Sequence, residues 1–116
     1  MKSFTDLKQS RKLAEILPLE SADMCYIKGK AHLGFLYEEY KEFGDSILQE
    51  YEPCWSLAAL LSLIPYVSLE EYNGAWSCNS YDKETHKHVF GKVTGDSIDA
   101  CYEMIIKLHE LNLLEL

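Results

Sequence analysis

The chain lacks the glycine-rich loops with which many enzymes hold phosphate groups. Its six glycines are scattered, and none belongs to a GxxxxGK[ST] or GxGxxG sequence. The sequences GxSxG and HExxH, which mark many serine hydrolases and zinc peptidases, are also absent. Nucleotide hydrolysis, dinucleotide chemistry and these two hydrolase classes therefore have no support in the sequence.

Long apolar runs and clusters of basic residues are also missing. The longest uncharged stretch, 53–69, is interrupted by Pro65, and its apolar part, 54–64, is shorter than the roughly 20 residues that span a bilayer. Charged residues interrupt the N-terminal region, where a secretory signal would be apolar. Lys and Arg form no cluster that would bind nucleic-acid phosphates. We expect a cytoplasmic protein that binds neither membranes nor the nucleic-acid backbone.

The composition is that of an acidic globular protein. The 116 residues are 47% apolar and 26% charged, which is enough for one folded domain, residues 1–116, with one core. The formal net charge of −8 is concentrated in residues 31–72, where one Lys stands against eight acidic residues. We interpret this charge as a source of solubility, with attraction of a basic partner as the alternative.

A capping box predicts the first helix. In the sequence Ser3-Phe4-Thr5-Asp6, the side chains of Ser3 and Asp6 can bind the unpaired amides at a helix start. The helix is expected at about 4–17 and ends before Pro18, because proline lacks an amide and disfavours helix at the preceding residue.

The next part of the chain is less regular. Residues 24–36 have the pattern of two short strands around a turn at Lys28-Gly29-Lys30. Residues 37–51 are rich in Glu and Tyr and contain Gly44, which we expect to interrupt any regular element. This segment fits either a short helix or an irregular connection.

Two further helices carry apolar faces. Pro53 suits the first position of a helix at about 54–64, because no amide is needed there. A break at Gly95 and two good capping residues precede another helix at about 97–111. The apolar positions of these helices follow the helical period, at Leu57, Leu60, Leu61 and Ile64 in one, and at Ile98, Cys101, Tyr102, Ile105, Leu108 and His109 in the other.

A β-hairpin is predicted between these helices. Its strands are 75–81 and 86–93, and the polar residues 82–85 form the loop. If Tyr81 pairs with His86, alternation places an apolar set of residues on the core side. This set is Trp76, Cys78, Val89, Gly91 and Val93, and we also assign Trp55 to the core.

The other side of this hairpin is the candidate binding surface. It combines two aromatic rings with two imidazoles, and exposed aromatic groups are enriched at contact surfaces. The candidate binding residues are Asn79, Tyr81, His86, His88 and Phe90.

The cysteines and histidines give weaker indications of chemistry. The four cysteines are widely spaced, without a CxxC sequence, and we expect buried free thiols. The candidate nucleophiles are Cys54, Cys78 and Cys101, each of which would need a histidine partner. Cys78 and Cys101 lie on predicted apolar faces, and a helix start would lower the pKa of Cys54, but no histidine is assigned near it. His86 and His88 are expected about 7 Å apart on one strand face, which suits two metal ligands, but no further ligands accompany them. We therefore predict no metal, no cofactor and no catalytic residue.

Three segments resemble a group of proteins from mobile genetic elements. Residues 53–61, PCWSLAALL, together with 99–108, DACYEMIIKL, and 19–24, LESADM, are similar to small uncharacterised proteins carried by phages and mobile elements of gut bacteria. This resemblance implies an accessory protein and brings no activity or site residue with it.

The predicted fold is α+β, with a small antiparallel sheet packed against the helices at about 54–64 and 97–111, and with an N-terminal helix. The predicted function is a non-enzymatic module that binds or regulates another protein. The alternatives are a small hydrolase or transferase that uses Cys54 or the pair His86 and His88, and a homodimer formed through the hairpin.

Overall fold

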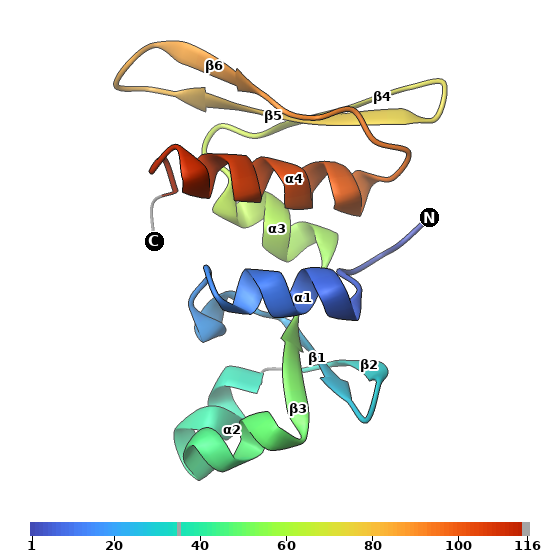
Figure 1. Cartoon of the computed structure of the whole chain (residues 1–116), viewed down its shortest axis with the longest axis vertical. Coiled ribbons are helices and arrows are strands. Elements are labelled where there is room, and N and C mark those ends of the chain that lie inside the picture. Colours follow the sequence, from blue (N-terminus) through green and yellow to red (C-terminus); the bar gives the residue numbers. More distant parts are fainter. Residues whose placement is uncertain (35, 115–116) are drawn as a thin grey trace. The chain divides into compact units, whose positions relative to one another are not determined.

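A computed structural model, which describes residues 1–34 and 36–114, has the predicted α+β fold (Figure 1). Its described residues include four α-helices and two antiparallel sheets of three strands each. The chain divides into two compact units, one formed by residues 4–59 and the other by residues 1–3 with 60–116. The expectation of a single domain stays a prediction, and the two units are described separately.

The first helix of the 4–59 unit, α1 (Leu7–Ala14), is shorter than predicted. Its N-cap is Asp6, which exchanges hydrogen bonds with Gln9, so the capping box lies three residues beyond the predicted position. The reason is that the preceding residues are extended. Phe4 forms a β-bridge with Ser56, and the Thr5 amide donates to the Trp55 carbonyl at 2.9 Å.

A small sheet forms the centre of this unit. Its strands are β1 (Met24–Ile27), β2 (Lys30–Leu33) and β3 (Tyr51–Cys54), in the order β2-β1-β3. Lys28 and Gly29 join β1 to β2 with positive φ angles of 52° and 81°, which suit a two-residue hairpin turn. The predicted pair of short strands is therefore confirmed.

Pro53 lies in β3 and does not begin a helix, which corrects the prediction for that residue. β3 is an edge strand, where a missing amide is tolerated. The helix α3 (Leu57–Leu63) begins later because Ser56 caps it, with Oγ accepting from the Ala59 amide at 3.2 Å.

Residues 37–51, which the sequence left open, contain two helical segments. α2 (Leu36–Phe43) is followed by the 3-10 helix η2 (Gly44–Gln49), and Gly44 marks the break with a φ of 70°. Another 3-10 helix, η1 (Leu19–Ser21), follows α1.

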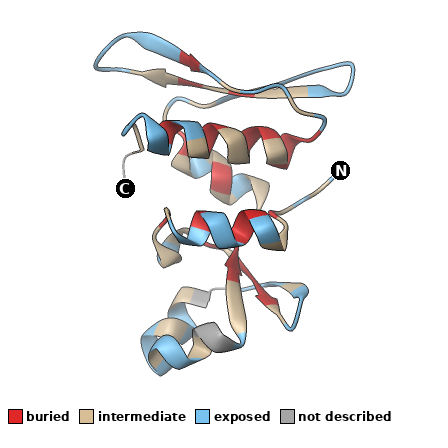
Figure 2. Ribbon diagram, viewed as in Figure 1, coloured by how far each residue is buried: buried red, intermediate tan, exposed pale blue. Residues whose placement is uncertain are grey.

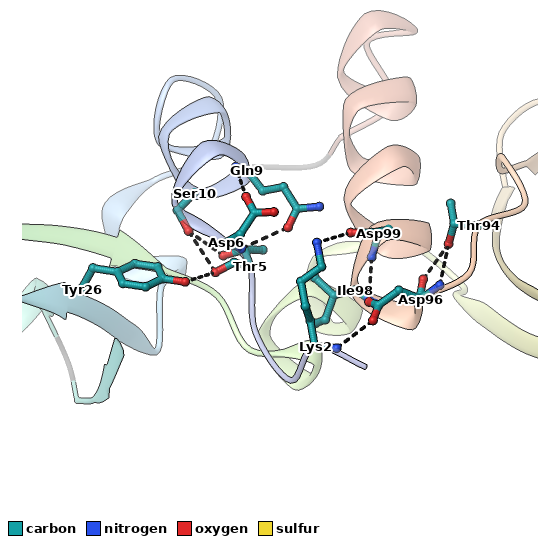
Figure 3. A network of polar contacts seen from close by, with 10 residues as sticks. All are labelled: Lys2, Thr5, Asp6, Gln9, Ser10, Tyr26, Thr94, Asp96, Ile98 and Asp99. Carbon is teal, nitrogen blue, oxygen red and sulfur yellow. Dashed lines mark hydrogen bonds and ion pairs between the residues drawn. The ribbon is translucent and has the colours of Figure 1, made fainter. Parts of the chain in front are cut away.

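The core of the 4–59 unit combines apolar packing with a buried polar network. Met24, Tyr26 and Cys54 are buried together, and three half-buried apolar side chains cover them, namely Phe4, Leu7 and Ala31. The hydroxyls of Thr5 and Ser10 lie 2.7 Å apart, and the Tyr26 hydroxyl donates to the Thr5 carbonyl at 2.7 Å (Figure 3). These bonds satisfy polar groups that burial would otherwise destabilise.

The other unit contains the sheet β4-β5-β6, formed by β4 (Ser68–Tyr72), β5 (Ala75–Asp82) and β6 (Lys87–Phe90). Asn73 and Gly74, with φ angles of 51° and 81°, join β4 to β5 in the tight turn that their sequence favours. β4 was not predicted, because Leu69 is its only aliphatic residue and the strand carries a weak alternating pattern.

The helix α4 (Ser97–Glu110) packs against β5, and its buried face is continuous (Figure 2). The predicted helix at 97–111 is confirmed, and its end differs from the prediction by one residue. Asp96 caps it by accepting from the amides of Ile98 and Asp99. One predicted face position is corrected, because His109 is exposed. The described helices include none that is both long and apolar enough to cross a membrane.

Candidate functional site

The hairpin β5-β6 differs from the predicted register by two residues. Tyr81 pairs with His88, not with His86, and Asn79 pairs with Phe90. The turn consists of residues 83–86. Because side chains alternate with a period of two, a shift of two residues leaves each side chain on its predicted face up to Phe90.

A β-bulge follows Phe90, and the side chains beyond it point to the face opposite to the predicted one. Trp76 and Thr94 exchange backbone hydrogen bonds of 2.7 and 2.8 Å, so three residues after Phe90 oppose two residues of β5. A Cβ atom on Gly91 would lie 2.1 Å from the Cys78 carbonyl oxygen, and only glycine fits this approach. Val93 is consequently 63% exposed, which corrects its assignment to the core.

The core side of the sheet is otherwise close to the prediction. Cys78 and Val89 are buried. Trp55, in the other unit, is fully buried as predicted, whereas Trp76 is only half-buried. Trp76 lies opposite the chain beyond β6, where only the isolated bridge to Thr94 continues the pairing.

Four rings form a continuous row on the outer side of the sheet. The ring centroids of Tyr66 and Tyr81 are 6.0 Å apart, those of Tyr81 and His88 are 5.1 Å apart, and those of His88 and Phe90 are 5.8 Å apart. Tyr66 and Phe90 are 62% and 64% exposed, while Tyr81 is half-buried. We call Tyr66, Tyr81, His86, His88 and Phe90 the outer aromatic surface.

His86 belongs to the turn and not to the strand. It has a φ of 57°, and its Nδ1 lies 3.1 Å from the Tyr81 hydroxyl. The predicted arrangement of His86 and His88 on one strand face is therefore wrong, because the loop lies one residue later than predicted. Among the residues that the structure describes, no group of three or more His, Cys, Asp or Glu side chains could hold a metal ion.

Asn79 has a structural contact within the hairpin. Its side-chain oxygen accepts from the Gly91 amide at 3.1 Å, at the point where the bulge interrupts the ladder. In the turn, the Asp82 carboxylate accepts from the Thr85 hydroxyl, a bond that lowers the pKa of Asp82. These bonds hold the hairpin that carries the outer aromatic surface.

The cysteines are enclosed in the two cores. Cys54 is fully buried in β3, and burial raises the pKa of its thiol, which corrects the expectation that a helix start lowers it. In the other unit, Cys78 and Cys101 are fully buried, and a hydrogen bond between them raises the pKa of Cys78. A nucleophilic cysteine needs an accessible thiolate, and none of these three thiols has that environment.

Each unit contains a cavity that the sequence did not predict. One, of about 240 Å³, has Tyr66 and Tyr81 in its wall and lies beside the outer aromatic surface. The other, of about 410 Å³, lies in the 4–59 unit among residues of α1, η1, α2 and β3. Tyr66 was also missed, because its position opposite Tyr81 follows only from the pairing of the unpredicted β4 with β5.

Comparisons with models of known protein families, with curated proteins and with solved structures find no match to this chain.

Proposed function

We propose that this chain is a non-enzymatic binding module that acts by contact with another protein through the outer aromatic surface. The observation that carries the proposal is the row of four rings from Tyr66 to Phe90, of which three are exposed and Tyr81 is half-buried. Aromatic side chains that remain exposed and contiguous are unusual outside contact surfaces. Removal of such rings from water by a partner provides much of the free energy of binding.

The charges next to this surface favour a partner with acidic groups. Lys87, Lys92 and Lys107 are exposed near β6, and the Lys107 ammonium donates to the Phe90 carbonyl at 2.5 Å. Asp82, which pairs with Lys87, and Glu84 lie in the hairpin turn region, so the excess of lysines is confined to the part of the surface around Phe90. A partner that presents an apolar patch flanked by Asp or Glu would complement both features.

A Cys- or His-dependent hydrolase or transferase receives less support. The Cys54 thiol is buried with a raised pKa, while His86 lies in the exposed turn and His88 on the exposed face of the sheet. The cytoplasmic location and the phage or mobile-element context also remain proposals, which rest on the sequence alone.

Affinity capture with matched variants tests the proposed function. The wild-type protein, a Phe90→Ser variant and a Tyr72→Ser variant are used to capture partners, and the affinity for the captured protein is then measured. Tyr72 is 79% exposed at the other end of the sheet and serves as the control.

We expect Phe90→Ser to weaken binding at least tenfold and Tyr72→Ser to leave it nearly unchanged. Equal binding by all three proteins contradicts the proposal. Self-association that Phe90→Ser abolishes would instead make a second copy of the chain the partner.

A further inference from the structure

We propose that the cavity of the 4–59 unit binds a small apolar carboxylic acid. This site is separate from the outer aromatic surface and does not depend on the function proposed for it. Its volume of about 410 Å³ lies in the range of roughly 300–1,000 Å³ that is typical of small-molecule pockets. The inference rests on the chemistry of the cavity wall.

Most of the wall is apolar, and part of it is firmly held. Trp55 is fully buried, and its indole Nε1 donates to the Ser21 hydroxyl at 2.9 Å. Leu17 is 5% exposed. The apolar lining residues are Ala14, Leu17, Leu19, Pro53 and Trp55. A ligand with an aromatic or branched aliphatic body would displace water from this wall without disturbing buried polar groups.

The polar side chains on the wall include the Arg11 guanidinium and its partner carboxylate, Glu52. The other polar lining residues are Ser10 and Tyr40, whose hydroxyls already bond to Thr5 and Asp45, and Tyr51. Arg11 binds Glu52 through Nε at 2.7 Å and Nη2 at 3.1 Å, and this bond occupies both carboxylate oxygens of Glu52. Guanidinium has five N–H donors, so three remain for another acceptor. Tyr51 also lines the cavity, and within the described residues its hydroxyl has no hydrogen-bond partner.

A carboxylate fits this donor set better than other head groups. Arg11 is exposed, and its ion pair with Glu52 lies at the surface, where such pairs contribute little stability. The guanidinium can therefore bind a second carboxylate with little loss of stability. An ammonium group would meet the positive guanidinium and would have to displace Arg11 to reach Glu52, whose two oxygens Arg11 already binds. A neutral amide would lack the charge-assisted hydrogen bonds that a carboxylate makes with arginine.

The test compares 4-phenylbutyrate with its neutral analogue, 4-phenylbutyramide, on the full chain. Binding is followed by the NMR shift of the Trp55 indole N–H in a Trp76→Phe background, which leaves one indole signal. We expect saturable shifts with the acid and at least about tenfold weaker binding of the amide.

Matched variants locate the site. Ala14→Phe fills the cavity and is expected to abolish the shifts, whereas Ala58→Phe, at an exposed position of α3 outside the cavity wall, is expected to leave them. Arg11→Gln should lower the affinity for 4-phenylbutyrate about tenfold, whereas Lys12→Gln on the same helix should leave this affinity unchanged.

Three results would overturn the proposal. The first is the absence of saturable shifts with 4-phenylbutyrate in the folded wild-type chain. The second is binding that Ala14→Phe leaves intact, since the acid would then occupy another place. The third is equal affinity for acid and amide, which would show that the site does not recognise the carboxylate.

Discussion

Individual residues of α4 differ sharply in burial, and this difference predicts their contribution to stability. Ile105 is fully buried and its neighbour Ile106 is half-buried. We expect Ile105→Ala to lower the free energy of unfolding by about 2–5 kcal/mol, through lost burial and the cavity that remains. Ile106→Ala should cost clearly less. Denaturant unfolding of both variants measures this, and equal losses would mean that the wrong face of α4 has been placed in the core.

Asp96 links the stability of α4 to pH. Burial acts to raise the pKa of its carboxylate, but the amides of Lys2, Asp99 and Ile98 donate to it, and the net pKa is lowered (Figure 3). A lowered pKa stabilises the folded state above the ordinary aspartate value of about 3.9. That stability is lost as pH falls through the lower value of the folded state.

Substitution at position 96 tests this linkage. We expect Asp96→Ala to cost about 1–2 kcal/mol at neutral pH through loss of the helix cap. Asp96→Asn keeps a capping oxygen but no titratable group, so its unfolding midpoint should fall less steeply than that of the wild type between neutral and acidic pH. Parallel pH profiles for the wild type and Asp96→Asn would show that Asp96 does not provide the linkage.

Among the elements, the bulge after β6 depends on one glycine. A Cβ atom at Gly91 would collide with the Cys78 carbonyl, whereas one at Gly95 would meet no atom within 4 Å. Gly91→Ala should therefore lower the free energy of unfolding by about 2–4 kcal/mol, and Gly95→Ala should change it by no more than about 0.5 kcal/mol. Thermal unfolding of the pair is the measurement. A Gly91→Ala variant as stable as Gly95→Ala would contradict the bulge.

The two faces of β6 give opposite predictions for neighbouring residues. Substitution of Tyr81 and Phe90 together by Ser should cost only about 1 kcal/mol, because Phe90 is largely exposed and Tyr81 half-buried. Val89→Ser should cost more, about 2–3 kcal/mol, since Val89 is buried on the other face. Melting temperatures compare the two, and a larger loss for the double variant would place the rings in the core.

Strong local patterns allowed several elements to be predicted, and long-range pairing decided the rest. The 97–111 helix follows from its apolar period and Asp96, and the faces of the hairpin follow from alternation. Pro53 was assigned to a helix start because the sequence around it favours one. Its place in β3 depends on pairing with Cys25, which is distant in the sequence, so no local pattern indicates that strand. The bulge was missed for a similar reason, since the need for Gly91 arises from the Cys78 backbone across the sheet.

At the scale of the whole molecule, the charge and the candidate sites are distributed unevenly. Along the sequence the acidic residues dominate 31–72, a segment that contributes to both units, whereas the outer aromatic surface lies beside exposed lysines of β6 and α4. The cavity of the 4–59 unit has an apolar wall that contains residues remote in sequence, such as Ala14 and Pro53. Sequence reasoning placed Tyr81, His88 and Phe90 on one face of the hairpin but could not identify the cavity, because only the fold brings its wall together.

The most direct test of the contact surface is site-specific photo-crosslinking. The photoreactive residue p-benzoylphenylalanine replaces either Phe90 or Leu33, which is 85% exposed in the other unit, and each protein is irradiated with its captured partner. The account predicts a discrete covalent adduct from position 90 and none from position 33. No adduct from position 90, or the same adduct from both positions, would contradict a contact made through the outer aromatic surface.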